Sequence, residues 1–128
     1  MIAVISSFGA VACAGGGSET HDRAATETCL QEKGYRPDVW PPSELPFHGG
    51  PAADGVLRFE AGDTEVGIAF NADADEAEQR VQALERTASQ WSPNPWFDVF
   101  ERKKDVVYWA RGGSSNQPMN DVNDCLAD

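Results

Sequence analysis

Two histidines are the side chains of this sequence best able to transfer a proton or ligate a metal near neutral pH. The 128-residue chain has His21, in a polar segment near the N-terminus, and His48, which precedes two glycines in a proline-rich stretch. A catalytic zinc site takes three protein ligands, and no such cluster is visible around either histidine. A Ser-His-Asp arrangement could use only His48, and the sequence has no Gly-x-Ser-x-Gly elbow. We therefore predict no catalytic residue, and an enzyme would have to combine His48 with nearby carboxylates.

Three oxygen-bearing side chains at alternate positions are the one pattern that suggests a metal ion. Asn71, Asp73 and Asp75 resemble the opening of a calcium-binding loop. Such a loop needs Gly at its sixth position and Glu at its twelfth, where this chain has Glu76 and Gln82. The same acids are explained by a helix N-terminus, which favours negative charge. We therefore predict neither a metal site nor a cofactor.

Aromatic residues are concentrated in the last third of the chain. Rings can stack on sugars or pack against partner proteins. The alternative is packing in the core and at the edge of a small domain, where aromatic rings contribute much of the buried area. An exposed patch would support the first interpretation, and full burial of the rings would remove it. The candidate binding face consists of Trp96, Phe100, Tyr108 and Trp109.

The overall charge limits the classes of partner. The chain has 21 acidic and 10 basic residues, for a net charge of −11. Nucleic acids and anionic membrane surfaces attract positively charged proteins. The composition therefore argues against direct binding to either of them.

The first residues, from Met1 to Ala14, are apolar and contain no charge. They are too few to span a bilayer as a helix, which takes about 20 residues. A short apolar segment followed by small residues is typical of a signal peptide. The alternatives are a secretory signal that is cut after Ala12 or Ala14, and an apolar core strand.

The segment Ala10-Val11-Ala12-Cys13 resembles the lipobox of bacterial lipoproteins, in which small residues precede a cysteine that is lipidated. It departs from the usual pattern because Ala10 stands where leucine is common. The Gly-rich segment after it is similar to a lipoprotein tether. The resemblance covers about the first 20 residues. It implies a signal peptide at residues 1–12, lipidation of Cys13, a flexible tether over residues 13–24, and one domain at 25–128.

The three cysteines are an odd number, which needs an explanation in an exported protein. If Cys13 carries lipid, Cys29 and Cys125 remain as one pair at the two ends of the folded part. Exported proteins meet oxidising conditions, where such a pair forms a disulfide. Closing a loop of roughly 100 residues stabilises a protein by about 4–5 kcal/mol. The alternative is two separate buried thiols.

The central part of the chain changes its periodicity once. Residues 64–70 alternate, with Val66, Ile68 and Phe70 on one side, which predicts a half-buried strand. After it, apolar residues recur every three or four positions, which predicts a helix capped by Asp73 and ended near Pro93. We place Arg80 on the outer face of this helix, paired with Glu76. The predicted inward stripe is Ala74, Ala77, Val81, Leu84 and Ala88.

The flanking segments complete the predicted fold. Residues 55–61 form a hairpin with the central strand, and residues 96–102 and 106–111 form a second one. Short helices are expected over 26–33 and 120–127, with an irregular proline-rich connection over 35–51. We predict an α+β fold with a four-stranded antiparallel sheet and one central helix packed on it. The short terminal helices would be joined by the Cys29–Cys125 disulfide.

Together these features predict a small, acidic, exported lipoprotein, tethered to the outer face of the cytoplasmic membrane or elsewhere in the cell envelope. It would bind an envelope protein or a small ligand without catalysis. The alternatives are a secreted soluble domain with a structural or inhibitory role, and an enzyme that uses His48.

Overall fold

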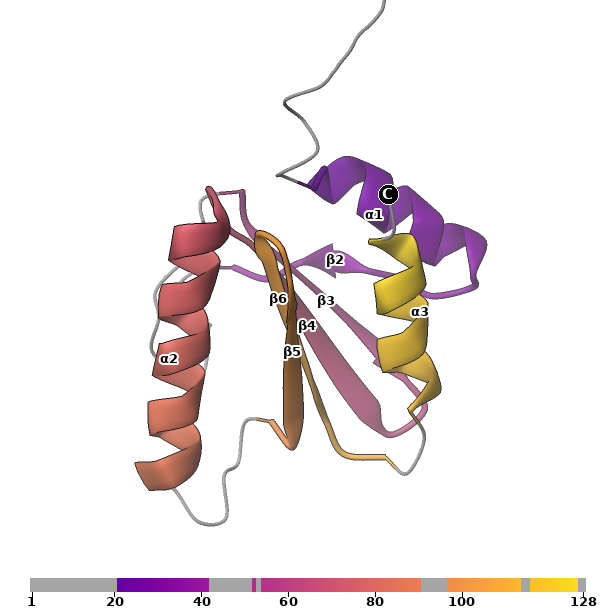
Figure 1. The fold of residues 1–128 in the computed structure, drawn as a ribbon. Helices are drawn as coiled ribbons and strands as arrows, with labels where there is room; N and C mark the ends of the chain where they lie inside the picture. The colour runs from indigo at the N-terminus through magenta and orange to yellow at the C-terminus, as the bar shows by residue number, and fades with distance from the viewer. Residues whose placement is uncertain (1–20, 42–51, 53, 91–96, 114–115, 127–128) are drawn as a thin grey trace, which may run out of the picture.

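The computed structural model of the chain describes residues 21–41, 52, 54–90, 97–113 and 116–126. The elements form three layers, with α2 on one face of a β-sheet and α1 and α3 on the other (Figure 1). The helices are α1 (Arg23–Glu32), α2 (Ala74–Gln90) and α3 (Gln117–Cys125). The strands are β2 (Asp38–Val39), β3 (Val56–Ala61), β4 (Thr64–Phe70), β5 (Val99–Lys103) and β6 (Val106–Arg111).

The sheet is antiparallel throughout, in the order β2-β3-β4-β6-β5. The α+β class and the β3–β4 and β5–β6 hairpins confirm the prediction. The predicted number of four strands is wrong, because β2 adds a fifth at the edge. Asp38 and Val39 pair with β3, and Pro37 and Pro41 flank them on an edge strand, where proline is tolerated. This short strand lies inside the stretch that we expected to be irregular.

Strand β4 lies in the middle of the sheet and is buried on both faces, so the prediction of a half-buried strand is wrong. Its large residues point toward α1 and α3, and its small residues point toward α2. Position 67 requires glycine because the indole of Trp109 lies over it. A Cβ at this position would come within 2.3 Å of the ring. The alternation that the sequence displays therefore separates a large-residue face from a small-residue face, not a buried face from an exposed one.

Helix α2 begins with the predicted capping contacts. The Glu76 amide donates to Asp73 Oδ1 (2.8 Å), and the Ala72 amide donates to Glu76 Oε1 (3.0 Å). The buried face of the helix is rotated from the predicted stripe, because Arg80 is only 4% exposed. The placement of Arg80 on the outer face is therefore wrong. The residues of α2 that are buried are Ala77, Arg80, Ala83, Leu84 and Thr87.

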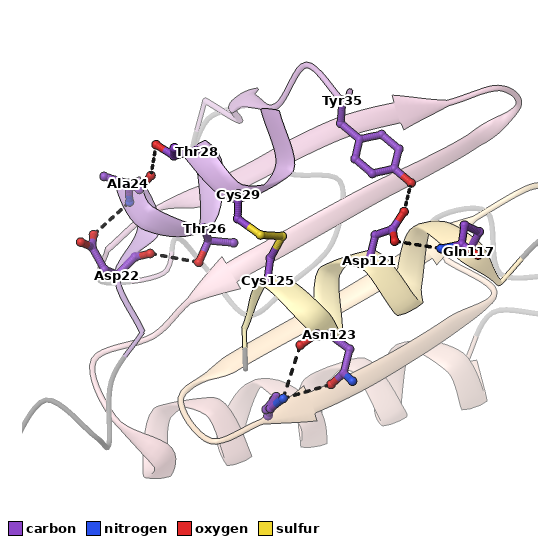
Figure 2. Close-up of a disulfide and its surroundings, with 11 residues drawn as sticks. Asp22, Ala24, Thr26, Thr28, Cys29, Tyr35, Gln117, Asp121, Asn123 and Cys125 are labelled. Carbon is purple, nitrogen blue, oxygen red and sulfur yellow. Dashed lines mark hydrogen bonds between the residues drawn. A yellow bond between two sulfur atoms is a disulfide. The ribbon is translucent and has the colours of Figure 1, made fainter. Parts of the chain in front are cut away.

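The terminal helices are joined by the predicted disulfide, Cys29–Cys125, which connects α1 to α3 with a Cα–Cα distance of 5.7 Å (Figure 2). Helix α1 begins earlier than expected because Asp22 caps it, accepting a hydrogen bond from the Ala24 amide at 3.0 Å. Residues 21–24, which we assigned to the flexible tether, therefore belong to the fold. Within the described ranges, no helix is long and apolar enough to cross a membrane.

Candidate functional site

The structure places the predicted site residues in three different situations. Cys13, His48 and Trp96 lie outside the described residues. Tyr108 and Trp109 are only 1% and 2% exposed, and they face opposite sides of the sheet. They are buried because β6 is an inner strand with helices over both faces, so these rings belong to the two cores and form no common binding face. The fourth member of that face, Phe100, is half-buried, and its ring meets Phe97 edge-on with centroids 5.5 Å apart.

The acidic residues after β4 serve the fold. Asp73 caps α2, as its position at a helix start predicted. The Asn71 side chain is fully buried and donates to the Asp105 carbonyl at 2.8 Å. In the described part of the chain, no three His, Cys, Asp or Glu side chains are grouped closely enough to hold a metal ion.

A buried hydrogen-bonded pair, His21 and Asp105, connects the start of the described chain to its end. Asp105 is 0% exposed, and its Oδ2 accepts a hydrogen bond from the His21 amide at 2.9 Å. Its Oδ1 lies 2.6 Å from His21 Nδ1, while His21 Nε2 lies 2.8 Å from the Leu126 carbonyl oxygen. One histidine thus joins the start of α1, the β5–β6 turn and the end of α3. Sequence patterns gave no sign of this contact, since 84 positions separate the His21–Asp105 partners.

Both ring nitrogens of His21 contact protein oxygen atoms. Nδ1 contacts the Asp105 carboxyl group, and Nε2 contacts the Leu126 carbonyl oxygen. Because Nε2 is already bonded to a backbone carbonyl, the ring has no nitrogen available to act as a base on a substrate. The His-Asp arrangement resembles part of a hydrolase site but works here as a structural clamp.

The same network continues to the other face of the sheet. Arg80 Nε donates to Asn71 Oδ1 at 2.9 Å, and the Asn71 amide donates to the Asp105 carbonyl at 3.1 Å. Burial lowers the pKa of Arg80, and the negative charge of Glu76 acts in the opposite direction. The spacing of Arg80 from Ala77 and Leu84 is that of one helix face, which could have identified it as inward-facing.

An open groove of about 640 Å³ lies where β2 diverges from β3. One wall is fixed by Tyr35, whose ring packs on Phe59 (centroids 4.5 Å apart) and whose hydroxyl donates to Asp121 on α3 (Figure 2). Burial, together with the hydrogen bond and charge of Asp121, raises the pKa of Tyr35 to about 12. The groove is lined by Gly34, Tyr35, Arg36, Asp38, Arg58, Phe59, Glu60 and Glu65.

Charged groups of both signs define what this groove can do. Arg58 Nε lies 3.3 Å from Asp38 Oδ1, and its guanidinium lies 5.4 Å from the centre of the Trp40 ring. Its lining also includes Arg36 and the carboxylates of Glu60 and Glu65. The groove therefore offers a polar ligand charged groups of both signs. The sequence did not predict this groove, because its walls come from separate parts of the chain.

Comparisons with protein-family models, curated proteins and solved structures give no significant match for this chain.

Proposed function

We propose that this protein is a small acidic lipoprotein, exported and tethered through Cys13 to the cell envelope, whose domain binds a partner protein or small ligand without catalysis. The observation that carries the proposal is the disulfide between Cys29 and Cys125. Disulfides form and persist mainly in oxidising compartments such as the periplasm and the cell surface. The bridge therefore supports export, which an apolar N-terminus also favours.

The disulfide also accounts for two of the three cysteines. The remaining one, Cys13, follows Ala10-Val11-Ala12, the segment that resembles a lipobox. A lipidated cysteine has no thiol left to pair, so this assignment gives every cysteine of an exported chain a role.

Binding is favoured over catalysis by the way that the polar groups are used. The His21 side chain is only 7% exposed, and both of its ring nitrogens contact protein oxygens. The groove beside Tyr35 offers charged side chains at a surface accessible to a ligand.

The test is an intact mass of the protein from membrane and soluble fractions of a bacterium that makes the full chain, with thiol labelling before and after reduction. We expect a membrane-bound form that begins at Cys13, carries the mass of a diacylglyceryl group, and gains two labels only after reduction.

A Cys13→Ser variant is the matched control. It should lose the lipid and the membrane association while keeping the Cys29–Cys125 disulfide. A soluble, unlipidated form of the original chain that starts after residue 12 or 14 would overturn the anchor and support a secreted domain instead.

A further inference from the structure

The edge strand β2 covers only part of its neighbour β3. Asp38 and Val39 pair with Arg58 and Leu57, and the Trp40 amide donates to the Val56 carbonyl at 2.8 Å. Strand β3 then continues to Ala61, beyond the last residue that β2 pairs with. This end of β3 is an edge of the sheet and forms one wall of the groove.

The free backbone groups on this edge belong to Glu60. In an antiparallel strand, successive residues direct their N–H and C=O groups alternately to the two sides. The Val56 carbonyl is bonded to Trp40 on the β2 side, whereas the Gly55 carbonyl is bonded to the Phe70 amide on the β4 side. Glu60 shares the parity of Val56, so its N–H and C=O point into the groove. In the described part of the chain, neither its backbone nor its carboxylate has a bonding partner.

The charge on the same wall favours a cation. Glu60 is directly opposite Glu65 in the β3–β4 register, and like charges in such a pair repel each other. Glu65 Oε1 lies 3.3 Å from Arg111 Nη2, which leaves Glu60 as the unpaired carboxylate. The other wall is held in place by the contacts of Tyr35 with Phe59 and Asp121. The groove is therefore preformed, which lowers the entropy lost when a ligand binds.

We propose that this groove binds an extended peptide, which adds a short strand in line with β2 and places a basic side chain on Glu60. The peptide backbone would pair with the N–H and C=O of Glu60, as in strand addition at an exposed sheet edge. This inference deepens the proposed binding function and rests on it. The opposite edge, β5, is less suited because its side chains reach the helices. Arg102 pairs with Glu78 at 2.8 Å, and Lys103 donates to Asn123.

The experiment is an NMR titration of the isotope-labelled full chain, carrying Cys13→Ser, with a seven-residue blocked peptide of alternating valine and lysine. We expect the largest shift changes at the Glu60 amide and its neighbours. Glu60→Lys should weaken binding about tenfold, since it replaces an attraction with a repulsion. Glu85→Lys makes the same charge change on the exposed face of α2 and should leave the affinity unchanged.

A second peptide separates strand pairing from simple attraction to an acidic protein. The same sequence with methylated backbone nitrogens keeps its charge but cannot donate to the Glu60 carbonyl, and it should not bind. The inference is overturned by equal binding of the two peptides, by shifts confined to β5, or by no shift at Glu60 at millimolar peptide. The intact-mass measurement tests lipidation of Cys13, and the titration tests peptide binding at Glu60. The two proposals can therefore be rejected separately.

Discussion

The two faces of the sheet hold their helices by different means. On one face, α1 and α3 have only 10 and 9 residues. Isolated helices shorter than about 12–15 residues are marginal in water, so they depend on tertiary contacts. Here the disulfide joins them, and the Tyr35 hydroxyl adds a bond to α3 (Figure 2). The core beneath them contains large side chains, such as Leu30, Ile68 and Leu126.

On the other face, α2 has 17 residues, and its N-terminus is capped by its own side chains. It packs close to the sheet because the contact between α2 and β4 is formed by small side chains, such as Ala77 and Ala69. Gly67 makes room for the Trp109 ring on the same face. The comparison shows that a covalent link joins the short terminal helices, whereas close steric fit, together with polar contacts of Glu78 and Arg80, holds the long internal helix.

The largest effect should come from removing the link on the α1/α3 face. Replacing both Cys29 and Cys125 with alanine should lower the free energy of unfolding by about 4–5 kcal/mol, because a loop of nearly the whole domain is no longer closed in the unfolded state. Urea unfolding measures the change, and Cys13→Ala serves as the control. Hydrogen exchange should accelerate first in α1 and α3. A loss below about 1 kcal/mol would mean that packing alone holds these helices.

The second effect concerns the buried His21–Asp105 contact, which joins α1 and α3 to the β5–β6 turn. Asp105→Ala should cost about 3 kcal/mol, because it leaves the buried His21 ring without its carboxylate. Asp54→Ala, at an exposed carboxylate, is the control for urea unfolding. A loss no larger than that of the control would contradict a structural role for the His21–Asp105 contact.

A smaller effect tests the steric fit on the α2 face. Gly67→Ala should cost about 1–3 kcal/mol, since the new methyl group would overlap the Trp109 indole. The near-ultraviolet circular dichroism should change with it as the ring moves. In a Trp109→Ala background the same change should cost much less, because the overlap is gone. Additive losses in this double-mutant cycle would show that the ring does not require glycine.

The smallest effect is the pH dependence of the free energy of unfolding. It should arise from the two tyrosines of the chain, which both lie on the α1/α3 face. The pKa of Tyr35 is about 12 in the fold against 10.0 for a free side chain, so between these values the unfolded state binds fewer protons. The free energy of unfolding should therefore fall as pH rises above about 10. Tyr35→Phe should reduce the slope of the free energy of unfolding against pH. Part of the slope should remain, because burial also raises the pKa of Tyr108. An unchanged slope in Tyr35→Phe would exclude Tyr35 as a contributor.

Much of the local structure was predictable, because its signals lie within a few residues of one another. Alternation located β3, β4 and β6, and Gly62-Asp63 located the first turn. Asp73 and Glu76 located the start of α2. The Cys29–Cys125 disulfide was also predictable, because assigning Cys13 to lipidation leaves only these two cysteines to pair.

Tertiary structure decided which faces are buried and where the polar sites lie. The pattern of β4 could not show that a second layer covers it, and nothing near His21 in the chain indicates Asp105 or Leu126. The free edge at Glu60 depends on how far β2 extends along β3, which the course of the chain before Asp38 determines. The sequence by itself determined the helices, the hairpins and the covalent link, since these follow from local periodicity and residue chemistry. The clamp, the groove and the inward Arg80 arise from contacts between distant segments, which exist only once the layers have packed.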